Sequence, residues 1–424
     1  MSVNTMRRRQ PLSPRSYVAF LVVSIVMVTT GYAQVPSVSD KLALYASVGP
    51  ELTHYELDAV TATLTKRDSL TLPENVQYAW PHPSRRFLYV AWSNGVDGDQ
   101  HGMTAFTVDP ESGTLRPHGQ LVRLPDRPIH LTVDSTATHL LVAYNAPSGV
   151  TVHRLAPDGT IGVQVVAPAP LDAGVYAHQI RVDASNQLAI LVARGNGPAA
   201  GRPEDPGALK VFGYQDGTLT NRASVAPGGG FDFQPRHLDF HPSKPWIFVS
   251  VERQNKLQVY PTLPEGMLGS APLFTKDSLT TPERVVTGQA AGTVHAHPNG
   301  RFVYQANRAN GTTDFRGKTV FAGGENTIAV YAINQDTGEP TLIQNIGTRG
   351  MRPRTFALDP TGRILVAANQ EPFLVREGER VSTIPASLAV FRVRADGKLD
   401  FVRKYDVTAS ESRSMLWSGI VSLR

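Results

Sequence analysis

The sequence predicts an all-β fold, a seven-bladed β-propeller of four-stranded antiparallel blades whose ring is closed by N- and C-terminal strands. Three observations support this prediction. A two-strand motif recurs along the chain, the second strand of each copy is a near-continuous apolar run, and no segment after the first 33 residues has the length and period of an ordinary helix.

Six copies of the motif follow one another. Each consists of a short strand, a turn opened by His or Asp, and a second, apolar strand, as in PRHLDFHPSKPWIFVSV from Pro235. The residues that open the six turns are His82, Asp134, Asp183, His241, His297 and Asp359. Their separations of 52, 49, 58, 56 and 62 residues are typical of a repeat architecture.

A third and a fourth strand usually follow each copy. Examples of the third strand are LQVYPT from Leu257, TIAVYAI from Thr327 and LAVFRV from Leu388. Four antiparallel strands per repeat describe a propeller blade, and the 391 residues after residue 33 make seven blades at roughly 56 residues each. We expect the seventh blade to combine SMLWSGIVSL, from Ser414, as inner strand with LALYASVG, from Leu42.

Residues 1–33 have the pattern of a cleaved secretory signal. Four arginines precede the apolar run Tyr17–Val28, and the small-residue site Gly31-Tyr32-Ala33 follows. The run is shorter than the ~20 residues that span a bilayer, so we expect cleavage before Gln34 and no membrane attachment afterwards. This predicts a signal peptide over 1–33, a propeller domain over 34–424, and a periplasmic or secreted protein.

Charge and cysteine content exclude several classes of function. Residues 1–33 hold four of the 41 basic side chains and none of the 36 acidic ones, so 37 basic and 36 acidic side chains remain, and a nucleic-acid partner is not indicated. The chain has no cysteine, which excludes disulfides, a thiol nucleophile and thiolate metal ligands.

Polar residues recur at two fixed offsets from the turns. The first strand of each motif starts at the same end of the blade where the second strand finishes, because a hairpin joins them. Five positions before the turn lie Gln77, Ile129, His178, Arg236, Gly292 and Arg354. Eleven positions after it lie Ser93, Asn145, Arg194, Glu252, Arg308 and Gln370. One rim of the central channel therefore collects an imidazole, a carboxylate and several guanidinium groups, as a pocket for an anionic small molecule requires.

These motifs resemble the seven-bladed β-propeller lactonase family, which includes bacterial 6-phosphogluconolactonases and fungal muconate-lactonizing enzymes. The resemblance runs from Leu42 to Leu423 and is most specific in HQIRVD, PRHLDFHP, FVSVE, HAHPNGRFVYQANR and PRTFALDPTGR. It implies that a His, Arg, Glu, Arg quartet carries the chemistry, and by motif these are His178, Arg236, Glu252 and Arg308. The offsets select the same four, with Arg194, Arg354, Gln370 and Asn145 as substrate-binding candidates at the edge.

The implied reaction is the hydrolysis of a sugar-acid or related carboxylate lactone. Either Glu252 or a neutral His178 could take the water proton, and Arg236 and Arg308 could hold the oxyanion and the carboxylate. No cofactor and no metal site are implied, since the remaining histidines lack ligand spacing or belong to turns. An exported chain would meet a non-phosphorylated substrate. We expect the long insertions Gly195–Gly207, Ala309–Gly324 and Glu371–Pro385 to rise from the site face, where they could cover it.

Three alternatives remain open from the sequence. The first is a secreted propeller that binds a ligand or a protein without turnover, because propellers serve many roles. The second is a lactonizing cycloisomerase. The third is a calcium-dependent lactonase, for which a rim that offers mainly Glu252 and Asn145 among arginines is poorly suited.

Overall fold

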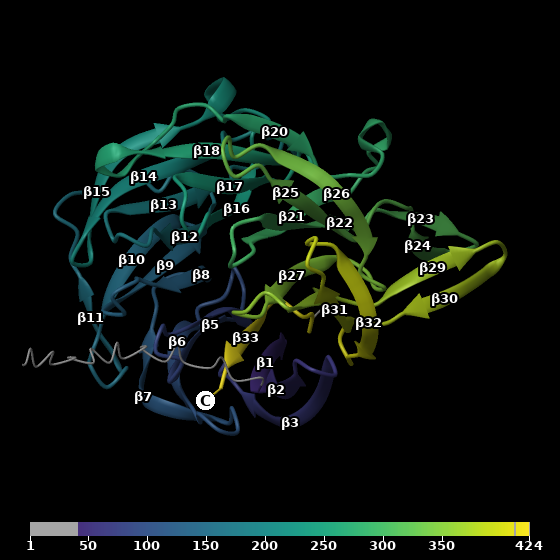
Figure 1. Cartoon of the computed structure of the whole chain (residues 1–424), viewed down its shortest axis with the longest axis horizontal. Coiled ribbons are helices and arrows are strands. Elements are labelled where there is room, and N and C mark those ends of the chain that lie inside the picture. Colours follow the sequence, from purple (N-terminus) through teal and green to yellow (C-terminus); the bar gives the residue numbers. More distant parts are fainter. Residues whose placement is uncertain (1–40, 411–412, 424) are drawn as a thin grey trace, which may run out of the picture. The chain divides into compact units, whose positions relative to one another are not determined.

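The computed structural model describes residues 41–410 and 413–423, and these residues form a seven-bladed β-propeller (Figure 1). The expected signal peptide lies outside the described residues. In chain order, the first three blades built from four consecutive strands are β4–β7, β8–β11 and β12–β15. Their bounds are β4 (Val76–Pro81), β5 (Phe87–Ser93), β6 (His101–Val108), β7 (Leu115–Arg123), β8 (Pro128–Val133), β9 (His139–Asn145), β10 (Ser148–Leu155), β11 (Ile161–Val165), β12 (Ala177–Val182), β13 (Leu188–Ala193), β14 (Ala208–Gln215) and β15 (Thr218–Val225).

The next three blades include the two that carry the insertions after β22 and β28. The first of the three blades is completed by β20, which pairs with β18 beside the short strand β19. Its strands are β16 (Pro235–Phe240), β17 (Trp246–Val251), β18 (Lys256–Leu263), β19 (Met267–Leu268) and β20 (Phe274–Asp277). The other two blades are β21 (Gln289–Ala296), β22 (Phe302–Ala309), β25 (Thr327–Ile333), β26 (Pro340–Gly347), and β27 (Pro353–Leu358), β28 (Ile364–Asn369), β31 (Ser387–Val393), β32 (Leu399–Asp406).

The seventh blade, called the closing blade below, combines both ends of the propeller. Its order is β3 (Thr63–Thr71), β2 (Glu51–Asp58), β1 (Lys41–Val48) and β33 (Ser418–Ser422), with β33 innermost. The β1–β33 ladder runs antiparallel from Leu42↔Ser422 to Ala46↔Ser418. This confirms the predicted fold and the predicted closure of the ring by N- and C-terminal strands.

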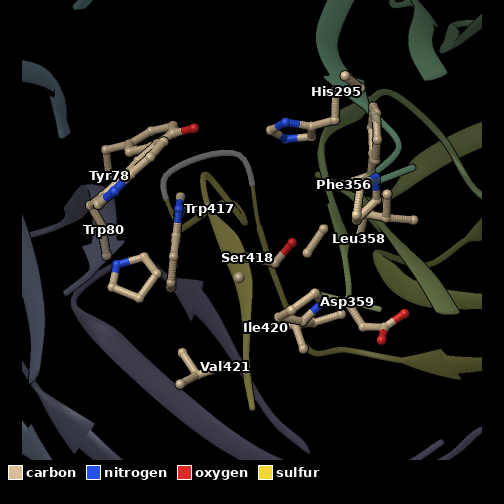
Figure 2. Close-up of a pocket in the computed structure, with 17 residues that line it drawn as sticks. Tyr78, Trp80, His295, Phe356, Leu358, Asp359, Trp417, Ser418, Ile420 and Val421 are labelled. Atoms are coloured by element: carbon tan, nitrogen blue, oxygen red, sulfur yellow. The ribbon is translucent and has the colours of Figure 1, made fainter. Parts of the chain in front are cut away.

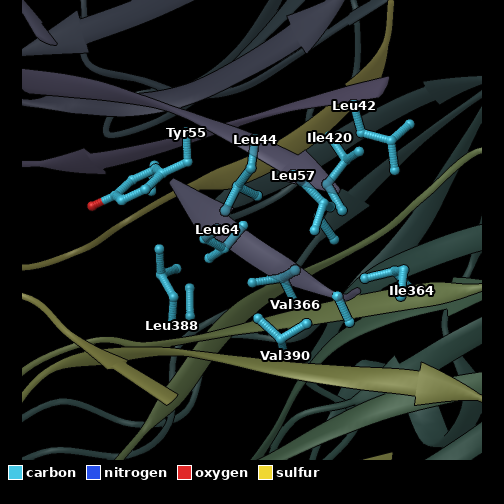
Figure 3. Close-up of a cluster of buried hydrophobic side chains, with 14 of the residues drawn as sticks. Leu42, Leu44, Tyr55, Leu57, Leu64, Ile364, Val366, Leu388, Val390 and Ile420 are labelled. Atoms are coloured by element: carbon cyan, nitrogen blue, oxygen red, sulfur yellow. The ribbon is translucent and has the colours of Figure 1, made fainter. Parts of the chain in front are cut away.

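Apolar clusters between adjacent blades hold the ring together. At the closure, Leu42, Leu44 and Leu57 of the closing blade pack with Ile364 and Val390 of the last repeat (Figure 3). All five side chains are fully buried. The near-continuous apolar strands seen in the sequence follow from this, since the second strand of each blade is covered by a neighbouring blade on both faces.

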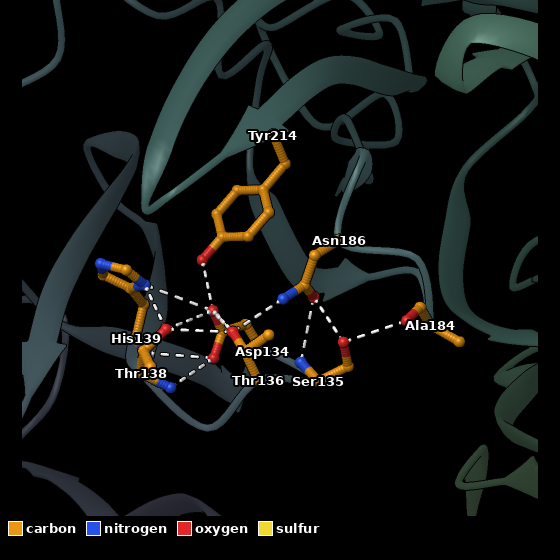
Figure 4. A network of polar contacts seen from close by, with 8 residues as sticks. All are labelled: Asp134, Ser135, Thr136, Thr138, His139, Ala184, Asn186 and Tyr214. Atoms are coloured by element: carbon orange, nitrogen blue, oxygen red, sulfur yellow. Dashed lines mark hydrogen bonds and ion pairs between the residues drawn. The ribbon is translucent and has the colours of Figure 1, made fainter. Parts of the chain in front are cut away.

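The turns that open with His or Asp link each blade to the next. The Asp134 carboxylate accepts hydrogen bonds from the backbone N–H of Thr138 (2.8 Å) and His139 (3.1 Å), and from the Tyr214 hydroxyl of the following blade (3.0 Å) (Figure 4). His241 uses Nδ1 to accept from the backbone N–H of Lys244 (2.9 Å) and Nε2 to donate to the Gly300 carbonyl (3.0 Å). These residues therefore serve the scaffold.

Regular helix is confined to single turns in the part of the chain that the structure describes. They are the 3₁₀ turns η1 (Pro227–Gly230), η2 (Pro264–Gly266) and η3 (Pro282–Arg284). None of the helices in the described ranges is long and apolar enough to cross a membrane.

Candidate functional site

A β-bulge lies at the residue five positions before the turn, which the sequence places at the channel rim. Between β12 and β13 the ladder passes from Ala177↔Ala193 to Gln179↔Val192 and leaves His178 without an opposite residue. The same shift omits Arg236 from the β16–β17 ladder and Arg354 from the β27–β28 ladder. A bulged residue is released from the regular alternation of the strand, so its side chain can be re-aimed.

Glu252 is the centre of a charged cluster, also called the Glu252 cluster below, that contains Arg194, Arg236 and Arg308. It follows β17, and its Oε2 lies 2.7 Å from Arg236 Nη1, while its Oε1 lies 2.8 Å from Arg308 Nη2 and 3.7 Å from Arg194 Nη1. Burial would raise the pKa of Glu252, but the three guanidinium groups outweigh it and lower that pKa to about 2. The carboxylate is therefore ionised at neutral pH and already fully engaged in ion pairs.

His178 lies beside this cluster as a buried, neutral imidazole. Its ring centroid is 5.1 Å from that of His237 and 6.4 Å from that of Tyr176. Nδ1 is buried and has no hydrogen-bond partner among the described residues. Burial, followed by the charge of Arg236, holds the pKa of His178 well below 6.5. Of the two candidate bases, His178 is the one whose ring nitrogen is free to receive a proton.

Two further arginines give the rim a surplus of positive charge. Burial and the nearby Arg236, Arg352 and Arg127 lower the pKa of Arg354 to about 9, and within the described residues no carboxylate pairs with it. Arg127 donates from Nε (3.0 Å) and Nη2 (2.8 Å) to the neutral side-chain oxygen of Gln77. Arg352, by contrast, pairs with the carboxylate of Glu371. Half-buried guanidinium groups without a counter-ion favour an anionic ligand.

Of the eight predicted site residues, six lie close enough to interact with one another, and two make no such contact. His178, Arg194, Arg236, Glu252, Arg308 and Arg354 interact through ion pairs or electrostatic contacts. Gln370 instead bonds the Ser414 hydroxyl (3.2 Å), and the side-chain amide of Asn145 is buried with no partner within the described chain. A cavity of about 150 Å³ is lined by Gln77, Arg127 and Ser414, among others, and Arg127 is close enough to Arg354 to affect its pKa.

Sequence reasoning missed a layer of rings below the cluster. Tyr78, His130 and His237, called the ring layer below, each lie four positions before their turn, one position after the bulge. The ring centroids are 4.2 Å apart for Tyr78–His130, 6.2 Å for His130–His237 and 6.4 Å for Tyr78–His237. Their shared offset, one position after that of His178 and Arg236, is the sequence signal that marks them. Arg127 precedes β8 and lies seven positions before Asp134, as Arg352 lies seven before Asp359, outside the two offsets considered above.

The buried histidines predict a loss of stability in mild acid. Burial holds the pKa of His130, His178 and His237 well below 6.5 in the folded chain. Below the unfolded pKa of about 6.5 the unfolded chain binds more protons than the folded one, so stability falls with pH, by up to about 1.4 kcal/mol per pH unit for each histidine. Urea titrations at pH 7.5 and 5.5 should show this slope, and His237→Gln should reduce it. Equal unfolding free energies at the two pH values would contradict it.

Two of the three long insertions do not cover the channel, contrary to the expectation. They form the hairpins β23 (Thr312–Phe315) with β24 (Lys318–Phe321) and β29 (Phe373–Glu377) with β30 (Arg380–Ile384), which project outward from the ring (Figure 1). Phe321 and Phe373 pack edge to face between them, with ring centroids 6.1 Å apart. Because each hairpin buries apolar surface on the other, neither folds back over the rim. The loop over 195–207 stays near the site, where Glu204 pairs with Arg253 (3.4 Å).

Metal ligation is not favoured by the described side chains. Within residues 41–410 and 413–423, no group of three or more His, Asp or Glu side chains is placed to hold an ion. The only carboxylate in contact with the charged cluster's arginines Arg194, Arg236 and Arg308 is Glu252. The donor set therefore suits an anion rather than a cation.

Comparisons with known proteins agree with this architecture. Residues 42–383 match the family model described as "Lactonase, 7-bladed beta-propeller". The chain is 28% identical over 352 residues to the 6-phosphogluconolactonase of Bacillus subtilis, covering 79% of this chain and 90% of the relative. It is 28% identical over 311 residues to that of Cronobacter sakazakii, covering 73% and 81%.

Solved structures share the fold. A periplasmic gluconolactonase from Pseudomonas aeruginosa superposes with a TM-score of 0.65 at 19% identity, covering 91% of this chain and 100% of the other. A protein from Lactobacillus plantarum superposes with a TM-score of 0.68 at 22% identity, covering 91% and 100%. At sequence identities of 19% and 22%, these superpositions show a shared fold, that is, the same arrangement of blades.

Proposed function

The chain belongs to the seven-bladed β-propeller lactonase family, and from this premise we propose that it hydrolyses a lactone that carries an anionic group, without a metal ion. The observation that supports this most is the charge of the channel rim. Three arginines share one carboxylate, Glu252, while Arg354 and Arg127 have no carboxylate partner in the described chain. An anionic lactone would supply the missing negative charge.

We propose a sugar-acid or related carboxylate lactone as the natural substrate. The curated relatives are 6-phosphogluconolactonases, and one structural neighbour is a periplasmic gluconolactonase. The signal-like N-terminus favours export, which would separate the protein from cytosolic phosphorylated sugars. Mass spectrometry of the native protein tests the export: a mature N-terminus near Gln34 supports it, and an intact Met1 contradicts it.

The proposed reaction divides the work between His178 and the arginines. Water attacks the lactone carbonyl carbon while His178 takes a proton from it, and the tetrahedral oxyanion is held by the guanidinium groups of Arg236 and Arg308. Collapse breaks the bond to the ring oxygen, which recovers the proton and leaves as a hydroxyl. The product is the open-chain hydroxy acid, which releases its acidic proton to solvent, and the resulting carboxylate stays paired with arginine.

Glu252 acts in this scheme as a positioning residue. Its pKa of about 2 makes it a poor proton acceptor at neutral pH. Its two short ion pairs hold Arg236 and Arg308 in one fixed arrangement, which is the preorganisation that oxyanion binding requires. The substrate's own anionic group would offset the arginine charges that disfavour a protonated His178, so that group should assist turnover as well as binding.

We predict that Arg354→Ala separates anionic from neutral lactones. The variant should raise KM for an aldarolactone, which carries a free carboxylate, by roughly tenfold or more, since a charge-assisted contact contributes about 1.5–3 kcal/mol. KM for an uncharged lactone of the same ring size should change little. Arg116→Ala, at an exposed position on β7, is the matched control. Equal effects on the two lactones would show that Arg354 does not contact the anionic group.

A further inference from the structure

A second cavity lies in the same channel, toward the opposite end from the Glu252 cluster. It has a volume of about 280 Å³ and is bounded by the inner strands β4, β21, β27 and β33 (Figure 2). Its lining includes Pro81 at the end of β4, and Pro298 and Pro360 in the turns that follow β21 and β27, so it extends to the turn face. None of the residues of the Glu252 cluster lines it. Tyr78 of the ring layer forms its inner end.

The cavity wall is mainly aromatic and apolar. Tyr78, Trp80, Phe356 and Trp417 surround the space, and Ile420 contributes aliphatic surface (Figure 2). Tyr78 and Trp417 pack edge to face at 6.4 Å between ring centroids. A cavity of about 150 Å³ lined by apolar side chains is already large enough to take up benzene. A single six-membered aromatic ring therefore fits this one.

Two polar groups face the aromatic wall. The imidazole of His295 and the hydroxyl of Ser418 both point into the cavity (Figure 2). Ser418 is only 5% exposed, and its Oγ has no hydrogen-bond partner among the described residues. An unsatisfied buried hydroxyl is costly unless a bound molecule or water completes it. The cavity thus offers an incomplete hydrogen-bonding site within an apolar wall.

The neighbours of His295 determine which hydrogen-bonding role it offers. Its Nδ1 lies 3.4 Å from Asp239 Oδ2, and Asp239 also pairs with Arg181 Nη2 at 2.9 Å. Burial would raise the pKa of Asp239, but Arg181 and the His295 contact outweigh it and lower it to about 2, so Asp239 is an ionised acceptor. Nδ1 of a neutral His295 must then carry the proton, which leaves Nε2 as an acceptor toward the cavity.

We propose that this cavity is a second binding site, specific for a small phenolic ring, and separate from the lactone site. The ring lies between Trp80, Phe356 and Trp417. Its hydroxyl donates a hydrogen bond to His295 Nε2, and Ser418 Oγ is the second polar contact for the phenolic oxygen. The site is independent of lactone hydrolysis, because the ring layer stands between it and the Glu252 cluster.

The test compares phenol with anisole, which has the same ring but no hydroxyl proton. Calorimetric titration of the mature protein at neutral pH should show phenol binding about tenfold more tightly than anisole, the usual size of one hydrogen bond. Tryptophan fluorescence should respond to both, since Trp80 and Trp417 line the cavity. In His295→Phe, phenol should bind only as tightly as anisole.

A second pair of variants locates the site without relying on His295. Ala296→Leu narrows the cavity and should weaken both ligands by tenfold or more, whereas Ala200→Leu, on the exposed part of the 195–207 loop, should weaken neither. Melting curves confirm that each variant is folded. The proposal is overturned if phenol fails to bind at millimolar concentration, if phenol and anisole bind equally, if Ala296→Leu leaves binding unchanged, or if gluconate displaces phenol.

Discussion

His178→Gln is expected to lower kcat by at least ~100-fold with little change in KM. Loss of a general base costs about 10²–10⁴ in rate, and glutamine keeps a polar side chain of similar reach but cannot take a proton. Because His178 is neutral and not ion-paired in the folded chain, its removal leaves the Glu252 ion pairs in place. The measurement is steady-state kinetics on an anionic lactone, with His118→Gln on the outer strand β7 as control.

Glu252→Gln should give a different pattern. The substitution leaves Arg236, Arg308 and Arg194 without their shared carboxylate, so KM, kcat and thermal stability should all change. If instead Glu252→Gln lowered kcat alone while His178→Gln kept full activity, Glu252 would be the base and the assignment above would be wrong.

Deletion of the last ten residues should abolish cooperative folding. It removes β33, the inner strand of the closing blade, and with it the buried side chains Met415, Trp417, Ile420, Val421 and Leu423. At about 2 kcal/mol for each large apolar side chain, the loss is roughly 10 kcal/mol, comparable with the whole stability of a typical protein. β1 would also become an unpaired edge in the channel.

The matched control removes a similar number of residues from outside the ring. Replacing Phe373–Ile384 of the β29–β30 hairpin by a short Gly-Ser linker should keep a cooperative melting transition, because the hairpin belongs to none of the seven blades. Calorimetry of the two proteins makes the comparison. A C-terminal truncation that melts like the full chain would show that β33 does not close the ring.

The repeat made the fold predictable, and it made part of the site predictable. His178, Arg236 and Arg354 share one offset, and Glu252 and Arg308 share another, because each blade repeats the same hairpin geometry. The bulge that releases the first three from their ladders leaves no mark in the sequence. Neither do the ion pairs that engage Glu252, since these depend on distances between different blades.

Features outside the repeat were beyond sequence reasoning. Arg127 lies outside the two offsets that predict the site, and the hairpins β23–β24 and β29–β30 are visible in the sequence only as long insertions. Their outward projection depends on the mutual packing of Phe321 and Phe373, residues 52 positions apart, which no local pattern reveals. The aromatic cavity likewise combines Trp80, Phe356 and Trp417 from three blades.

The central claim is most directly tested by hydrolysis of a lactone panel with the mature protein, with and without a chelator. The panel should pair aldarolactones, which carry a carboxylate, and phosphorylated aldonolactones with neutral lactones of the same ring size. The product should be followed as the hydroxy acid. We predict that the anionic lactones are hydrolysed fastest, that the chelator leaves the rate unchanged, and that His178→Gln removes it. Loss of activity with chelator would contradict a metal-independent reaction, and binding of sugar acids without hydrolysis of any lactone would identify the protein as a binding propeller instead.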